Sequence, residues 1–146
     1  MKFCIDVNVF LNIKNKEEPY YRYSKKLVEF IDGGRAEAII PTIVVAELCV
    51  GYYEFNELEH KDEFLAELSA NPSYRIVGLD LRIADEAARI RAGTHLRVPD
   101  AIIVASSLAA NALALVTHDA ELAKAQNLIR VISAKQALKE LEAGTK

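Results

Sequence analysis

Short apolar segments alternate with longer amphipathic ones along the chain. Each short segment lacks the alternation of a half-exposed strand, which is typical of strands covered on both faces of a parallel sheet. We predict five such strands at residues 3–6, 38–40, 74–77, 113–117 and 129–132.

The segments between the strands carry apolar residues at helical spacing. They predict helices at residues 7–13, 20–32, 43–53, 56–69, 81–91, 100–110, 120–126 and 133–142. Gly33 and Gly34 end one helix, Pro99 opens another, and Asn56 with Glu59 forms a candidate capping pair. Alternation of strands and helices indicates an α/β fold: one domain, residues 1–146, with a central parallel sheet of four to five strands in a three-layer α/β/α sandwich.

Composition and charge narrow the functional classes. The chain of 146 residues is 51 % hydrophobic with a net charge of −3, so it lacks the overall positive field of a basic nucleic-acid-binding protein. Cys4 and Cys49 stand alone in apolar sequence and predict buried thiols. With neither a secretory signal nor a membrane span in the sequence, we expect a cytoplasmic protein without a membrane partner.

Four carboxylates occupy positions that a parallel sheet would bring to one edge. Asp6 ends the first strand, Asp119 follows the fourth, and Asp100 lies in the first turn of the helix after Pro99. Glu47 interrupts an apolar helix, where we do not expect a solvated glutamate. Ligands bind outside the carboxyl ends of such strands, and a divalent cation such as Mg²⁺ or Mn²⁺ would neutralise the acidic cluster. Taken singly, each aspartate also fits a helix-capping role.

Four segments, in this order, resemble the motifs of PIN-domain ribonucleases, including VapC toxins of type II toxin–antitoxin pairs. They are Asp6-Val7-Asn8, Val45-Ala46-Glu47-Leu48, Pro99-Asp100-Ala101-Ile102-Ile103-Val104-Ala105 and Val116-Thr117-His118-Asp119. The resemblance spans roughly residues 3–132. One departure is Val7, where the family often has Thr or Ser.

The resemblance implies a Mg²⁺- or Mn²⁺-dependent endoribonuclease that cleaves RNA phosphodiesters with a metal-activated water. Asp6, Glu47, Asp100 and Asp119 would be the catalytic and metal-binding residues, and Asn8 and Thr117 would support them. PIN toxins usually form homodimers and are paired with an antitoxin, so the resemblance further implies a homodimer and a cognate antitoxin. Two alternatives stay open: a stand-alone RNA-processing nuclease, and a catalytically silent module that binds RNA or protein.

An acidic protein needs local cations to bind RNA. The candidates flank the acidic motifs and are Lys14, Lys16, Arg89, Arg91 and Arg97. Arg22, Lys25 and Lys26 belong to the same basic segment as Lys14, and each of these cations also fits a solvated surface. His118 adjoins Asp119, but one histidine beside a carboxylate is weak evidence for catalysis.

Other enzyme classes lack their motifs. A haloacid-dehalogenase-type phosphatase would require a second aspartate at position 8, which is Asn8. The sequence contains no glycine-rich phosphate loop, no nicotinamide fingerprint and no strand–elbow–helix nucleophile.

Overall fold

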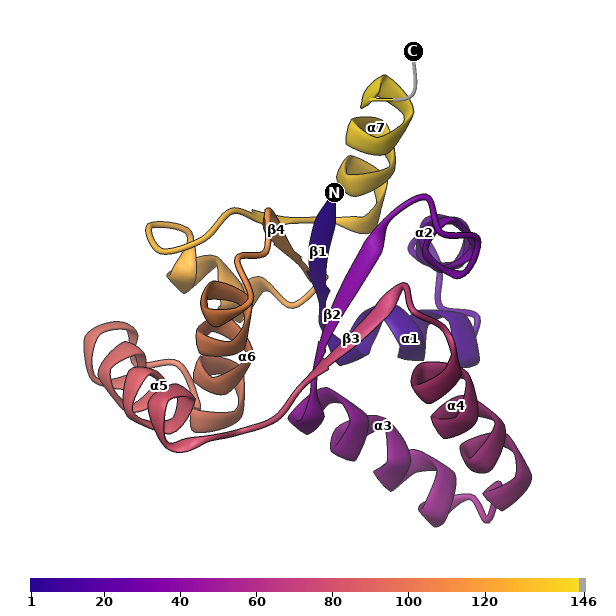
Figure 1. The fold of residues 1–146 in the computed structure, drawn as a ribbon, viewed down its shortest axis with the longest axis horizontal. Helices are drawn as coiled ribbons and strands as arrows, with labels where there is room; N and C mark the ends of the chain where they lie inside the picture. The colour runs from indigo at the N-terminus through magenta and orange to yellow at the C-terminus, as the bar shows by residue number, and fades with distance from the viewer. Residues whose placement is uncertain (145–146) are drawn as a thin grey trace.

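A five-stranded parallel sheet forms the centre of the protein, in a computed structural model that describes residues 1–144 (Figure 1). The strands are β1 (Lys2–Ile5), β2 (Glu37–Pro41), β3 (Tyr74–Val77), β4 (Ala114–Val116) and β5 (Val131–Ile132), in the order β3-β2-β1-β4-β5. Every neighbouring pair is parallel. The predicted α/β class and parallel sheet are therefore confirmed, while positions 145–146 of the predicted domain lie outside the described residues.

Helices cover both faces of this sheet (Figure 1). Their bounds are α1 (Val7–Lys14), α2 (Tyr21–Asp32), α3 (Thr42–Glu54), α4 (Leu58–Ala70), α5 (Leu81–Thr94), α6 (Val98–Ala109) and α7 (Ala134–Gly144), with a 3₁₀ helix η1 (Ala120–Ala125). The helix α6 packs between the sheet and α5, whereas α1, α2 and α7 lie on the other side. Among the described residues, no helix is both long and apolar enough to cross a bilayer.

Three of the predicted helices differ from the observed ones, two in a boundary and one in helix type. The helix α5 continues past Arg91 to Thr94, because the reversal comes one residue later, at His95, whose φ of 63° lies in the left-handed region. Asn56 also adopts a left-handed φ, of 54°, and α4 begins after Glu57 without a side-chain cap, so the predicted capping pair is wrong. The short helix after β4 is 3₁₀ rather than α.

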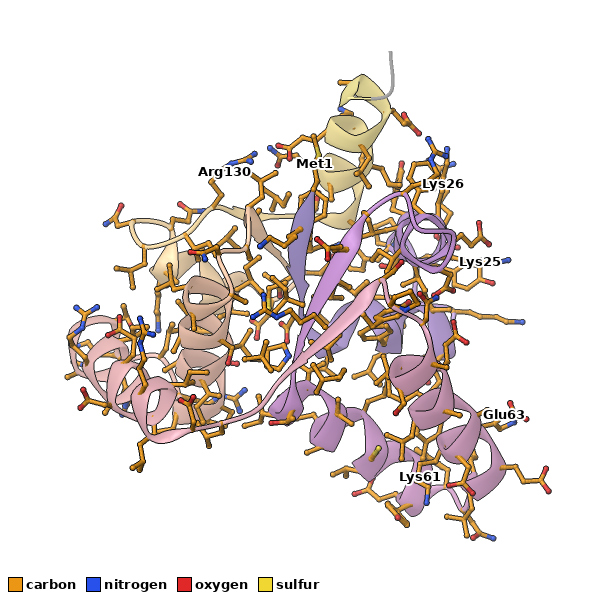
Figure 2. The ribbon with its side chains drawn as sticks, viewed as in Figure 1. Met1, Lys25, Lys26, Lys61, Glu63 and Arg130 are labelled. Atoms are coloured by element: carbon orange, nitrogen blue, oxygen red, sulfur yellow. The ribbon has the colours of Figure 1, made fainter. Side chains whose placement is uncertain are left out.

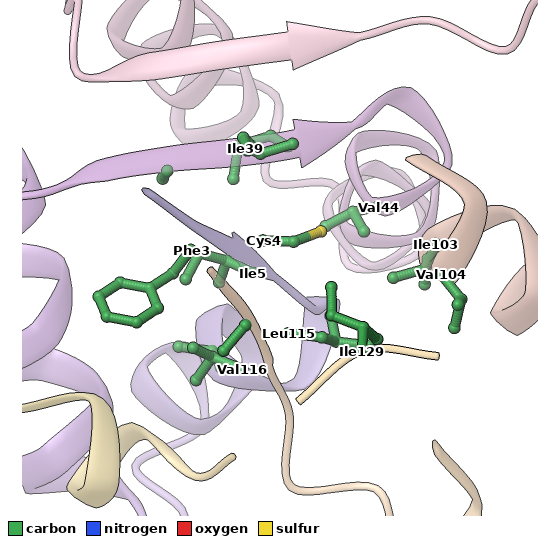
Figure 3. Packing of buried hydrophobic residues seen from close by; sticks show 14 of the residues in the cluster. Phe3, Cys4, Ile5, Ile39, Val44, Ile103, Val104, Leu115, Val116 and Ile129 are labelled. Carbon is green, nitrogen blue, oxygen red and sulfur yellow. The ribbon is translucent and has the colours of Figure 1, made fainter. Parts of the chain in front are cut away.

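The core lies on both faces of β1 and β4 (Figure 3). Phe3, Ile5 and Leu115 are fully buried, and Cys4 faces the opposite side of the sheet from Phe3. Burial raises the pKa of the Cys4 thiol to about 12, which keeps the thiol protonated and inert. Cys49 is only half-buried, because it lies on a side of α3 that the core does not cover.

The register of the two central strands positions the functional edge. Ile5 pairs with Val116, so the next residues, Asp6 and Thr117, leave β1 and β4 side by side. The Asp6 amide donates a hydrogen bond of 3.0 Å to the Val116 carbonyl and extends the ladder to that point. The carboxyl ends of the central strands therefore present polar residues together.

Leu115→Ala should destabilise the protein by about 3 kcal/mol, because it leaves a cavity in a fully buried part of the central sheet. Leu113→Ala is the matched control, since Leu113 is 44 % exposed and its truncation should cost less than about 1 kcal/mol. Urea unfolding followed by circular dichroism measures both. Equal losses in the two variants would contradict the core described here.

Candidate active site

Asp6 is buried at the end of β1, with 4 % of its surface exposed. Its Oδ1 accepts a hydrogen bond of 2.7 Å from the Val7 amide, which caps α1. Its Oδ2 accepts bonds from the Thr117 hydroxyl at 2.7 Å and from the Asn8 Nδ2 at 3.0 Å. These bonds fix the orientation of a carboxylate that has little access to solvent.

Asn8 and Thr117 link the ends of β1 and β4. The Asn8 Nδ2 also donates to the Thr117 hydroxyl at 3.0 Å, and its Oδ1 accepts from the His118 amide at 3.0 Å. The Thr117 hydroxyl accepts from the Asp119 amide, also at 3.0 Å. Asp119 in turn caps η1 by accepting from the Glu121 amide. The two predicted supporting residues thus lie between Asp6 and Asp119.

Asp100 lies in the first turn of α6 and is only 6 % exposed. It does not cap the helix, because the residue at the cap position is Arg97. Among the hydrogen bonds of the described residues, its side chain has one partner, the Arg97 Nε, at 3.4 Å. A buried carboxylate with a single long hydrogen bond is poorly compensated, and capping therefore does not account for Asp100.

Glu47 is exposed on α3, so the expectation that its apolar neighbours shield it from solvent is wrong. The reason is that this face of α3 also leaves Val50 uncovered, at 53 % exposure, while Val44 and Leu48 face the core. The carboxyl group of Glu47 nevertheless lies within electrostatic range of Asp6 and Asp100.

The carboxylates of this edge, which we call the acidic site (Asp6, Glu47, Asp100 and Asp119), repel one another. Burial raises the pKa of Asp6, and the charges of Asp100 and Asp119 raise it further, against the hydrogen bonds from Thr117 and Val7. Partial burial also raises the pKa of Glu47, to which Asp6 and Asp100 add, while Arg97 opposes them. Within residues 1–144, no three acidic, histidine or cysteine side chains are close enough to hold one metal ion.

The cations predicted to bind RNA have different surroundings. Arg97 lies at the acidic site, with a side chain that is 75 % exposed. Lys14 forms an ion pair of 2.9 Å with Glu57, and Arg91 donates to the carbonyls of His95 and Leu96 at the end of α5. Arg89 pairs with Glu86 on α5. Lys16 is exposed in the turn after α1. The structure brings only Arg97 to the carboxylates.

His118 has a positioning role that the sequence alone did not reveal. Its Nε2 accepts a hydrogen bond of 3.2 Å from the Ala134 amide, so its Nδ1 carries the proton and donates to the Asn12 Oδ1 at 2.7 Å. Its ring stacks on Tyr20 at 4.3 Å between centroids. Burial lowers the pKa of His118, which agrees with a neutral ring. In the sequence, the only signal of this role is the position of His118 between Thr117 and Asp119.

Several solved structures share this fold. One is a toxin–antitoxin complex from Klebsiella pneumoniae, with a TM-score of 0.66 and 20 % identity over 90 % of this chain and 96 % of the other. VapBC2 from Rickettsia felis, bound to a DNA fragment from their promoter, gives 0.64 and 20 % over 91 % and 97 %. FitAcB from Neisseria gonorrhoeae gives 0.66 and 19 % over 91 % and 98 %.

At these identities the structural likenesses show the fold alone, whereas a match to a family model shows family membership. A search among curated proteins finds no match. The family model of the PIN domain matches residues 3–128, which include the whole acidic site. PIN domains are generally nucleases that use divalent metal ions. Since the match spans most of the chain, this protein belongs to the PIN-domain family.

Proposed function

We propose that this protein is a Mg²⁺- or Mn²⁺-dependent endoribonuclease whose acidic site holds the cation. The observation that carries the proposal is Asp100, which is buried in the first turn of a helix without capping it. Burial raises the pKa of both Asp6 and Glu47, and the charge of Asp100 adds to this effect, so the ionised forms of these carboxylates are disfavoured unless a cation is present. A purely structural residue at this position has no reason to remain an acid.

The donor set fits a hard divalent cation. Asp6, Glu47, Asp100 and Asp119 offer carboxylate oxygens, the ligands that Mg²⁺ and Mn²⁺ prefer. Among the described residues these carboxylates are not close enough together to hold one ion, so binding would require them to approach one another. When bound, such a cation activates water as the nucleophile and stabilises the negative charge that develops on the phosphate.

The other residues of the site would hold this arrangement in place. Thr117 and Asn8 fix Asp6 through hydrogen bonds to its Oδ2, and the Thr117 hydroxyl also fixes the backbone of Asp119. Arg97, exposed beside Asp100, would attract a phosphate of the RNA. The chain would thus orient the carboxylates and provide one positive charge, that of Arg97, for the phosphate.

We further propose the role of a toxin with a cognate antitoxin and a homodimeric state. Support for the toxin role is the fold shared with the toxin–antitoxin complex from Klebsiella pneumoniae. Support for a dimer is an apolar surface at the edge of the sheet, where Ile76, Leu79 and Leu81 are 41 %, 53 % and 90 % exposed. A cytoplasmic location remains a prediction.

Purified protein incubated with a mixed RNA pool should cut it in the presence of Mn²⁺ and leave it intact in EDTA. Mapping the cut ends identifies internal cleavage. The control variant is Glu59→Gln, which changes an exposed acidic residue on α4. It should cut the RNA at the native rate and thereby controls for differences between preparations. Equal cleavage of the RNA in EDTA, or no cleavage with Mg²⁺ or with Mn²⁺, would exclude the proposed reaction.

Asp100→Asn should leave the metal-free fold as stable as the native one or slightly more so. The variant's advantage should grow as pH rises from about 4, because the repulsion acts only once Asp6 and Glu47, whose pKa values are raised, have ionised. Cation affinity, read from the rise in Tm with Mn²⁺, and RNA cleavage should each fall roughly 100-fold.

The matched control for this variant is Asp80→Asn. Asp80 caps α5 through the Ile83 amide, outside the acidic site, and asparagine caps equally well. The control should bind Mn²⁺ and cleave RNA like the native protein. If Asp100→Asn melts lower and still cuts at the native rate, Asp100 is structural.

Expression of the native protein in bacterial cells should arrest growth, and Asp100→Asn should relieve the arrest. Co-expression of the product of a neighbouring gene should also restore growth if that product is the antitoxin. Normal growth together with cleavage in vitro would instead identify a stand-alone RNA-processing enzyme. Colony counts after induction measure the effect.

A further inference from the structure

A cleft between α2 and α7 gathers cations that the proposed reaction does not use. The two helices pack side by side, and the cleft between them has a volume of about 360 Å³. We call this cleft the basic cleft; its lining residues are Arg22, Tyr23, Lys26, Lys135, Leu138, Lys139 and Glu142. Four of these seven residues are positively charged, in a protein whose net charge is −3.

The cations form two rows that face each other. Arg22 and Lys26 are four residues apart on α2, and Lys135 and Lys139 are four residues apart on α7. Like charges at this spacing repel each other along each helix. Of the described residues that line the cleft, Glu142 alone is negative, and it pairs with Lys26 at 3.1 Å. Figure 2 shows Lys26 on the side of α2 that faces α7.

Tyr23 lies at the centre of this positive charge. Its hydroxyl accepts a hydrogen bond of 2.7 Å from the Arg22 guanidinium. The Arg22 Cζ and the Lys135 Nζ lie 4.8 Å and 5.4 Å from the centroid of its ring. The hydrogen bond from Arg22, and then the charges of Arg22 and Lys135, lower the pKa of Tyr23. The cleft therefore favours negatively charged groups.

One end of the basic cleft is tied to the acidic site through His118. The His118 ring accepts a hydrogen bond from the amide of Ala134, which directly precedes Lys135. The same ring stacks on Tyr20, one turn before Tyr23. His118 itself separates Thr117 from Asp119. An extended ligand that lies in the cleft would thus reach the residues that support the acidic carboxylates.

We propose that the basic cleft binds the sugar–phosphate backbone of a single RNA strand that extends from the acidic site. Residues four apart on a helix are separated by roughly 6 Å along its axis, so each row offers cations in series to successive phosphates. Cations interleaved with an aromatic ring are the combination by which proteins bind single-stranded nucleic acid without reading its sequence. An acidic peptide would require the cations but not the ring.

The inference rests on the proposed function for the identity of the ligand, and its test is independent of cleavage. Binding of a fluorescein-labelled oligouridylate is measured by fluorescence anisotropy in EDTA, at several salt concentrations. The test variant is Lys135→Glu/Lys139→Glu. The control is Arg75→Glu/Arg82→Glu, which reverses the same number of exposed charges on β3 and α5.

Relative to native protein, the test variant should bind roughly tenfold more weakly at physiological salt. The slope of log K against log salt should become shallower by about 1.4, since each phosphate contact on a single strand contributes about 0.7. The control should change affinity less than twofold. If the test variant does not fold, as judged by circular dichroism, Arg22→Gln/Lys26→Gln on the opposite wall should give the same weakening and the same direction of slope.

Two results would overturn the inference. One is equal affinity of the native protein and a folded variant with an altered basic cleft. The other is binding of polyglutamate at this cleft with no binding of the oligouridylate, which would identify a surface for an acidic protein. Loss of cleavage with intact oligouridylate binding would count against the proposed function instead, so the two failures are distinguishable.

Discussion

The parallel pairing of β1 with β4 is the constraint on which the rest of the site depends. It places Asp6 and Thr117 side by side, in a position where the threonine hydroxyl can reach a buried carboxylate. Asn8 then bridges both residues and accepts the His118 amide. A slip of one residue in this pairing would move Thr117 out of line with Asp6 and break the hydrogen bond between them. The packing that stabilises the sheet therefore also fixes the geometry of the acidic edge.

The acidic site combines local structural roles with electrostatic strain. Asp6 and Asp119 cap the elements that follow their strands, so part of their charge is compensated by backbone amides. Asp100 lacks such a role, and its charge acts against Asp6 and Glu47. Helix capping and ligand binding are thus not exclusive alternatives. The same side chain can begin a helix and leave an oxygen for a cation.

The charges of the protein are separated on its surface, and this separation is compatible with the proposed polyanionic substrate. The carboxylates of the acidic site lie near the carboxyl ends of the strands, whereas cations line the basic cleft between α2 and α7. His118 joins the two regions through hydrogen bonds to Asn12 and to the first residue of α7. Net charge describes neither region, because the charges of opposite sign occupy different parts of the surface.

The sequence by itself determined the strands, the parallel α/β class and the ends of strands at which Asp6 and Asp119 lie, because these follow from local patterns of apolar and polar residues. The resemblance to PIN-domain ribonucleases implied supporting roles for Asn8 and Thr117, and both side chains donate hydrogen bonds to Asp6 in the structure. Tertiary structure alone decided that Glu47 is exposed, that Lys14 pairs with Glu57, and that α7 lies against α2. Such outcomes depend on which elements become neighbours in space, and residues more than 100 positions apart, such as Lys26 and Glu142, carry no local signal of their contact.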